Sequence, residues 1–347
     1  MTETKVIKEC IMITEPIFFE RNRVGRVYSG GKLFADFFGD EPIDGFFPEE
    51  WIASGVRAIN KVQNGEREGV SKAENGEYFD DMLKEHRDEL LGENGKMRIL
   101  VKILDSAVRL PAQAHPDRAF SRKYFSSEYG KTESWIILGT RPGAKIYFGF
   151  KDGVNRETFS AAIDASKTDR DAMERLMEYV EPKVGDVFLV PAKTVHAIGA
   201  GCLILEVQEP TDFTIQPEHF CDEYELNDKE MYIGLTKDEA VECFNFGKAP
   251  KAEITPETVL DRDGVKVEKL IKPSDTDCFI LNRITLTGGE YTPNTGSYGV
   301  YIVTDGKGEI KGETYRREIA KGDYFFMPHC LMGKFTLGGN ITVAECY

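Results

Sequence analysis

Short runs of alternating apolar and polar residues recur along most of the chain. They are four to nine residues long, rich in Val, Ile, Phe and Tyr, and separated by Gly, Pro, Asp or Asn. This pattern is typical of antiparallel strands joined by turns. The expected strands cover residues 96–104, 134–139, 144–150, 186–191, 202–208, 266–271, 278–286, 298–303 and 323–328.

Two segments have helical rather than alternating spacing of their apolar residues. Residues 76–92 form one of them and end in Gly92, a plausible C-cap. Residues 156–180 form the other, with Glu157 or Thr158 as the end-cap candidate. Neither segment alternates with strands in a βαβ pattern, so the sequence predicts a mainly β core with inserted helices.

One local pattern occurs twice. Residues 183–191 and 321–328 each open a strand with Gly-Asp, which favours a tight turn, and close it with Pro, which ends strand pairing. The repeat predicts two related sandwich-type β-barrels connected by the polar stretch 246–262. We therefore expect an N-terminal domain over residues 1–245 that carries the chemistry, and a smaller C-terminal domain over residues 246–347.

Composition narrows the range of partners. The 347 residues include 44 Lys and Arg against 59 Asp and Glu, a net charge of −15. Such a charge repels nucleic-acid backbones, so we expect no nucleic-acid partner. It also repels a phosphorylated small molecule, which would need a local cationic pocket.

Further features favour a protein of the cytoplasm. No apolar run approaches the ~20 residues of a membrane span, and the first residues do not resemble a signal peptide. The seven cysteines are widely spread without a CxxC pair, which is untypical of a disulfide framework or a thiolate zinc site.

The five histidines are scarce enough for each to be examined as a metal ligand. Gln113 and His115 are two residues apart and point to the same side of an extended segment. Glu133 begins the next expected strand, and His196 follows the strand that ends in the first repeated Pro. Two His and a carboxylate are a catalytic metal arrangement, with the amide oxygen as an unusual further ligand. The remaining histidines, which lack matched partners, are interpreted as packing or surface residues: His86, His219 and His329.

At these residues the sequence resembles the type I phosphomannose isomerases, the zinc-dependent mannose-6-phosphate isomerases of the cupin superfamily. The similar segments follow one another in the family's order: residues 16–39, 50–54, 100–105, 113–117, 130–133 and 185–197. The resemblance implies two cupin-type (jelly-roll) barrels, the first with one zinc ion per chain and the second without a metal. The zinc ligands it implies are Gln113, His115, Glu133 and His196.

Two positions depart from the family pattern. Pro111 stands where the family usually has Ser, and Gln216 stands where the pattern leads to an active-site Arg. A neutral amide cannot replace the charge of a guanidinium in holding a phosphate. The sugar that the protein uses is therefore less firmly indicated than the fold or the metal.

The implied reaction moves a proton between C2 and C1 of a sugar through an enediol, so it needs a positioned base. Glu206, which matches a family active-site carboxylate, is the first candidate, and Asp212 is the second. Lys131 matches a family active-site position, and we expect it in catalysis and substrate binding. Lys102, within an otherwise apolar strand, is expected to face a wet pocket and to bind substrate together with Gln216.

Other residues are given ordinary structural roles. Arg21, Arg23, Arg26 and Arg118 are interpreted as surface charge, and Trp51 and Trp135 as core residues.

The sequence favours a metal-dependent isomerase of mannose 6-phosphate and fructose 6-phosphate and leaves three alternatives. These are an isomerase of a different or non-phosphorylated sugar, a non-catalytic sugar-binding cupin, and an iron-dependent cupin oxygenase. The oligomeric state and the metal used in the cell stay open.

Overall fold

A computed structural model describes residues 13–60, 65–249 and 251–347. Cys10 lies outside these residues, and the other six cysteines are free thiols. The fold is mainly β with antiparallel sheets, as expected, and each of the nine expected runs contains a strand. Among the described residues, no helix combines the length and apolar character that crossing a membrane would require.

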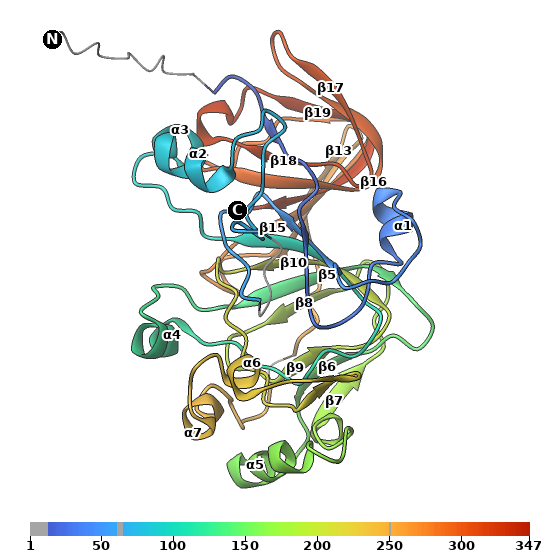
Figure 1. The fold of residues 1–347 in the computed structure, drawn as a ribbon. Coiled ribbons are helices and arrows are strands. Elements are labelled where there is room, and N and C mark those ends of the chain that lie inside the picture. Colours follow the sequence, from blue (N-terminus) through green and yellow to red (C-terminus); the bar gives the residue numbers. More distant parts are fainter. Residues whose placement is uncertain (1–12, 61–64, 250) are drawn as a thin grey trace, which may run out of the picture.

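Two sheets build the part of the molecule that holds the predicted site residues (Figure 1). Both contribute to one apolar core, in which Trp135 and Ile204 of the larger sheet lie with Ile146 and Ala197 of the smaller. The larger sheet has six strands in the order β2 (Arg23–Val24), β3 (Glu49–Ile52), β4 (Leu100–Ser106), β10 (Cys202–Gln208), β5 (Glu133–Thr140) and β8 (Val187–Val190). The smaller has the order β7 (Met177–Val180), β6 (Ile146–Phe150) and β9 (His196–Ile198).

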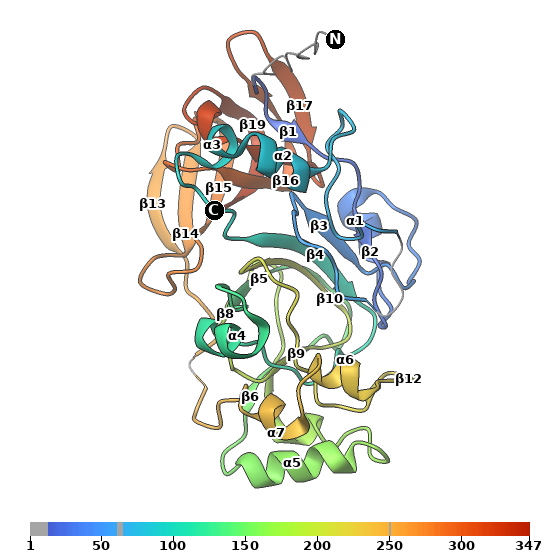
Figure 2. The same ribbon diagram turned by 60° about the vertical axis from the view of Figure 1, so that its left-hand side comes forward.

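An eight-stranded sheet forms the other part of the molecule, coloured orange to red in Figures 1 and 2 except for the blue β1. One of its faces packs on the six-stranded sheet, because Ile302 and Phe326 share a core cluster with Ile103 and Leu205. Its order is β1 (Ile17–Phe18), β18 (Tyr324–Met327), β16 (Gly299–Lys311), β19 (Thr336–Cys346), β15 (Leu281–Tyr291), β14 (Val265–Ile271) and β13 (Glu257–Arg262), with β17 (Arg316–Ala320) paired to β16.

Helices and one small hairpin complete the fold. Two helices lie beside the eight-stranded sheet, and the last three lie at the opposite end of the molecule (Figure 2). The helices are α1 (Phe34–Phe38), α2 (Phe79–Glu85), α3 (Arg87–Leu91), α4 (Arg118–Phe125), α5 (Arg156–Ala165), α6 (Asp228–Tyr232) and α7 (Lys237–Val241). Short 3-10 turns cover Glu174–Leu176 and His329–Leu331, and the hairpin pairs β11 (Phe220–Cys221) with β12 (Tyr224–Glu225).

The repeated Gly-Asp pattern forms the same turn at both places. Gly185 and Gly322 have φ angles of 93° and 92°, a region that favours glycine. Asp186 accepts a hydrogen bond from a backbone N–H three residues earlier at 2.7 Å, and so does Asp323. These turns lead into β8 and β18, one in each of the two large sheets.

Three expectations about local structure need correction. Helix α5 ends at Ala165, and residues 177–180 pair as β7 with β6. The N-cap of α5 is Asn155, which accepts a hydrogen bond from the backbone N–H of Thr158. The helical stretch 76–92 is divided between α2 and α3 at His86.

The third correction concerns the stretch 246–262, which was expected only as a connection and contains the strand β13 as well. The backbone of Ala252 and Ile254 hydrogen-bonds to Leu189 and Val187 of β8, and the following residues form β13. The expected division into domains at residue 246 stays a prediction. The strand β1, from the beginning of the chain, pairs with β18 across that division.

Candidate active site

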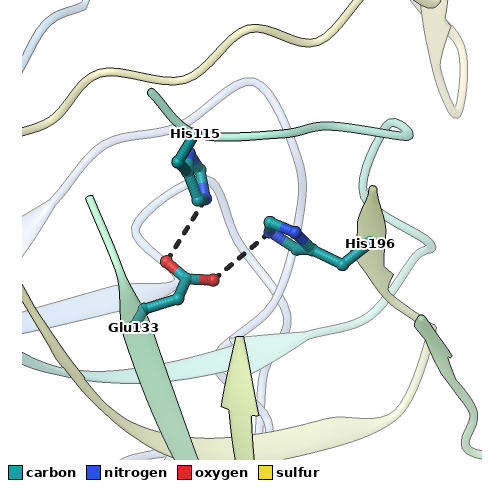
Figure 3. Close-up of side chains that lie close together, drawn as sticks. All are labelled: His115, Glu133 and His196. Carbon is teal, nitrogen blue, oxygen red and sulfur yellow. Dashed lines mark ion pairs between the residues drawn. The ribbon is translucent and has the colours of Figure 1, made fainter. Parts of the chain in front are cut away.

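Three of the four predicted ligands converge at one buried point (Figure 3). Glu133 is the first residue of β5, His196 is the first of β9, and His115 directly follows a short paired segment. One carboxylate oxygen of Glu133 lies 3.2 Å from His115 Nε2, and the other lies 3.3 Å from His196 Nε2. All three side chains are buried.

Hydrogen bonds on the far side of each imidazole fix which nitrogen faces the carboxylate. Nδ1 of His115 lies 2.9 Å from the carbonyl oxygen of Phe213, and Nδ1 of His196 lies 2.9 Å from that of Thr194. A carbonyl oxygen only accepts, so each Nδ1 carries the proton and each Nε2 presents a lone pair to Glu133. Burial, together with the charge of Lys131, lowers the pKa of His115 to about 3, which keeps this ring neutral.

This donor set fits a metal ion. His196 Nε2 and Glu133 Oε2 are buried and have no hydrogen-bond partner among the described residues. Nitrogen lone pairs and a carboxylate that face one another repel. The ammonium of Lys131, 3.0 Å from His115 Nε2 and 3.3 Å from Glu133, offsets part of this repulsion, but His196 Nε2 stays without a partner among the described residues. Imidazole with carboxylate suits zinc and other divalent transition metals. Burial raises the pKa of Glu133, but the charge of the neighbouring Lys131 outweighs it and holds that pKa well below its ordinary range.

Gln113, the predicted fourth ligand, is held next to His196 by the backbone. The two residues exchange N–H···O hydrogen bonds of 2.9 Å in each direction. The side chain of Gln113 is buried and lines the same cavity as His115 and Glu133.

A cavity of about 290 Å³ opens beside the cluster. It brings together residues from strands far apart in the sequence. Every predicted site residue except His196 lines it: Lys102, Gln113, His115, Lys131, Glu133, Glu206, Asp212 and Gln216.

Lys102 lines the cavity, as expected, and lies there within a group of carboxylates. Its Nζ is 3.3 Å from Glu206 Oε1 and 3.9 Å from oxygens of Glu49 and Asp212. Burial lowers the pKa of Lys102, but the three carboxylates outweigh it, so that the pKa is raised and the ammonium stays charged. The ring of Trp51 packs against this ammonium at 4.8 Å.

Arg26 and Glu49 are cavity residues that the sequence did not identify. Arg26 Nε lies 2.8 Å from Glu49, and Nη2 lies 2.9 Å from Asp212, so the interpretation of Arg26 as surface charge is wrong. Its partner Asp212 lies 186 residues away in the sequence, where no local pattern links them. A sequence signal for Glu49 existed, because it precedes Trp51 by two residues in a strand that is buried. In the structure, Trp51 Nε1 donates a hydrogen bond to Glu49 at 2.7 Å.

The two candidate bases differ in how their oxygens are used. Asp212 accepts from Arg26 on one oxygen and from Arg26 and the backbone N–H of Ile59 on the other. Glu206 Oε1 has no hydrogen bond among the described residues, although Lys102 lies near it. Burial and the charge of Glu133 raise the pKa of Glu206. A free oxygen and a raised pKa suit a group that takes up and returns a proton.

Among the remaining interpretations, that of Arg23 and Arg118 as surface charge is wrong, because each pairs with a buried carboxylate, Glu50 or Glu209. Trp51 and Trp135 are fully buried in the core. His219 hydrogen-bonds to Ser166, away from the cavity. Arg118 pairs with the buried Glu209 as well as with the exposed Asp277.

Comparison with known proteins supplies an independent result. No protein-family profile matches the chain. The mannose-6-phosphate isomerase of Streptococcus mutans is 28% identical over 322 residues, 92% of this chain and 94% of the relative. The mannose-6-phosphate isomerase ManA of Bacillus subtilis is 29% identical over 340 residues, 96% of this chain and 98% of the relative.

Solved structures agree with these relatives. The crystal structure of the Bacillus subtilis mannose 6-phosphate isomerase superposes with a TM-score of 0.77 at 24% identity, over 96% of this chain and 100% of that one. The structure of a putative mannosephosphate isomerase from Archaeoglobus fulgidus superposes with a TM-score of 0.72 at 19% identity. The superposition covers 97% of this chain and 99% of that one. The resemblance in the motifs is thus confirmed: over most of its length the chain is similar to proteins named mannose-6-phosphate isomerase, and it has the cupin fold of the solved structures.

Proposed function

We propose that the protein is a metal-dependent aldose–ketose isomerase that interconverts mannose 6-phosphate and fructose 6-phosphate. The observation that carries this proposal is the buried cluster of His115, Glu133 and His196 at the wall of a cavity that also exposes Glu206. Relatives of that name over almost the whole chain support it.

The metal of this proposal is one zinc ion per chain, held by the two histidines and Glu133, with Gln113 as fourth ligand. When bound, it would supply Lewis-acid polarisation of the sugar carbonyl. The Nε2 lone pairs already face inward, because the carbonyl oxygens of Phe213 and Thr194 hold the opposite sides of the rings.

The protein groups then perform the proton transfer. Glu206 takes the proton from one of the two carbons and returns it to the other on the same face of the enediol. Lys102 stabilises the ionised form of Glu206 from 3.3 Å, and Arg26 holds Asp212 and Glu49 in place around it. Lys131, 3.3 Å from Glu133, places a further positive charge beside the reacting oxygens.

One specific observation favours a second candidate, the isomerisation of a non-phosphorylated aldose. Gln216 is uncharged, and the cations Arg26, Lys102 and Lys131 inside the cavity are each occupied by carboxylates. A cavity arranged in this way suits a neutral sugar as well as a phosphate.

A coupled isomerase assay on zinc-loaded and chelator-treated protein separates these functions. Zinc-dependent turnover of mannose 6-phosphate, well above that of free mannose, is the expected result. Turnover of free mannose alone would establish the second candidate, and turnover of neither with metal still bound would favour a sugar-binding cupin. Oxygen uptake by the iron-loaded protein would indicate an oxygenase.

The proposal also covers the location of the protein and its division into domains. We expect the enzyme to act in the cytoplasm on a small-molecule sugar phosphate, as its sequence suggests. Two domains, divided near residue 246, with the chemistry in the first, remain part of the proposal.

A further inference from the structure

The cavity contains four cationic side chains, and three of them are already paired. Arg26 is bound by Glu49 and Asp212, Lys102 lies among three carboxylates, and Lys131 contacts Glu133. A charge that already balances a carboxylate attracts an incoming anion weakly, since the anion must share or displace that partner. The fourth cation is Lys229.

Lys229 differs from the other three in its surroundings. It is exposed at the cavity wall and forms no ion pair with any described residue. The adjacent carboxylate of Glu230 is occupied, because it accepts hydrogen bonds from the backbone N–H of Asn227 at 3.0 Å and from Tyr224 Oη at 2.6 Å. One bond comes from the N-cap of α6 and the other from Tyr224 of β12, and together they occupy both oxygens of the carboxylate.

Gln216 fixes α6 against the cavity. The backbone N–H of Gln216 donates to the carbonyl oxygen of Met231 at 2.9 Å, and its side-chain Nε2 donates to that of Glu230 at 3.2 Å. The residue that stands where an arginine was expected therefore holds the short helix that carries Lys229. Because the amide adds no charge of its own, the unpaired ammonium on this wall comes from Lys229.

We propose that Lys229 binds the phosphate group of the substrate and supplies the positive charge that Gln216 lacks. This inference rests on the proposed function, because it concerns a phosphorylated sugar in the same cavity. The metal cluster and Glu206 then act on the C1–C2 end of the sugar, while Lys229 holds the opposite end. An ammonium on a flexible stem binds phosphate as a point charge.

The test compares Lys229→Met with a matched control, Lys151→Met, an exposed lysine that does not line the cavity. Lys229→Met should raise KM for mannose 6-phosphate about 10-fold, as expected for a lost charge-assisted contact, and leave kcat nearly unchanged. Lys151→Met should behave as the wild type. The KM of the wild type should rise with ionic strength, and that of Lys229→Met should rise less.

A second variant separates a charge contact from a structural effect. Gln216→Arg in the Lys229→Met background should restore a low KM, since it returns a positive charge to the same wall. An unchanged KM in Lys229→Met, or an equal rise for free mannose, would overturn the inference.

Calorimetric titration with inorganic phosphate distinguishes a failure of this inference from a failure of the proposed function. Weaker phosphate binding by Lys229→Met than by Lys151→Met would support the phosphate site even if the wild type did not isomerise mannose 6-phosphate. Equal phosphate binding by the two variants would overturn it, even in an active isomerase.

Discussion

Lys102 and Glu206 stand directly opposite each other on β4 and β10, and 3.3 Å separates Nζ from Oε1. The relative position of the two side chains is therefore set by the ladder of an antiparallel sheet rather than by a loop. Glu133 belongs to β5, the other neighbour of β10, so the proposed base and one metal ligand share this rigid frame.

Glu206→Gln removes the proposed base and preserves its shape. We expect turnover to fall by about 10²- to 10⁴-fold, the usual effect of losing an acid–base group. Bound metal should stay at the wild-type level, as measured by elemental analysis, because Glu206 is not part of the cluster. Normal turnover in this variant would make Asp212 the leading candidate.

His196→Ala removes one of the three clustered ligands. We expect the variant to lose bound zinc and activity together, with both followed on the same preparation. His219→Ala is a matched control, since His219 contacts Ser166 and lies outside the cavity, and it should keep both. Full activity of a metal-free His196→Ala protein would contradict the proposed site.

Asp212→Asn tests the alternative base. Both carboxylate oxygens of Asp212 are occupied, so we expect this variant to retain far more activity than Glu206→Gln. It should unfold more easily, by on the order of 3 kcal/mol, because an amide N–H would face the buried guanidinium of Arg26. Urea unfolding and the coupled assay on the same variant measure the two effects, and activity as low as that of Glu206→Gln would reverse the assignment.

Lys102→Met distinguishes two roles for this lysine. Its expected part in phosphate binding predicts that the substitution raises the KM for mannose 6-phosphate more than the KM for free mannose. Its position among three carboxylates gives a different expectation, a fall in kcat for both sugars, because Glu206 loses the charge that stabilises its ionised form. Steady-state kinetics on the two sugars decides between these roles.

Glu345 should make the stability of the protein depend on pH. Burial raises its pKa above the ordinary value of 4.5, even though Asn282 and Tyr301 donate hydrogen bonds to it. The folded state therefore keeps a proton that the unfolded state releases, so the free energy of unfolding falls as pH rises from about 4.5 through the raised pKa.

Glu345→Gln removes this ionisation. We expect the variant to gain stability relative to the wild type between pH 5 and pH 8, as measured by urea unfolding at both values. A stability difference that stays constant over this range would show that Glu345 is ionised in the folded protein.

Much of the site could be predicted from local sequence. Gln113 and His115 share one side of an extended segment, and Glu133 and His196 each begin a strand, so the spacing and the ordered motifs identified them together. The strands could also be predicted, because the alternation of apolar and polar residues is visible among neighbours in the sequence.

The parts that were missed depend on contacts between distant segments. Arg26 is neutralised by Asp212, and nothing near Arg26 in the sequence indicates that pairing. The end of α5 was missed for a related reason. The chain beyond Ala165 leaves the helix without a glycine or proline stop signal, and only its pairing with β6 shows that 177–180 is a strand.

The pairing of β1 with β18 has a consequence for how the protein is made. Ile17 and Phe326 are partners in the ladder, so β1 can pair only after β18, a strand far later in the sequence, has left the ribosome. During synthesis the apolar side chains of Ile17 and Phe18, both buried in the finished protein, have no partner strand. The eight-stranded sheet therefore closes only after β18 has been synthesised, and until then the buried face of β1 stays exposed.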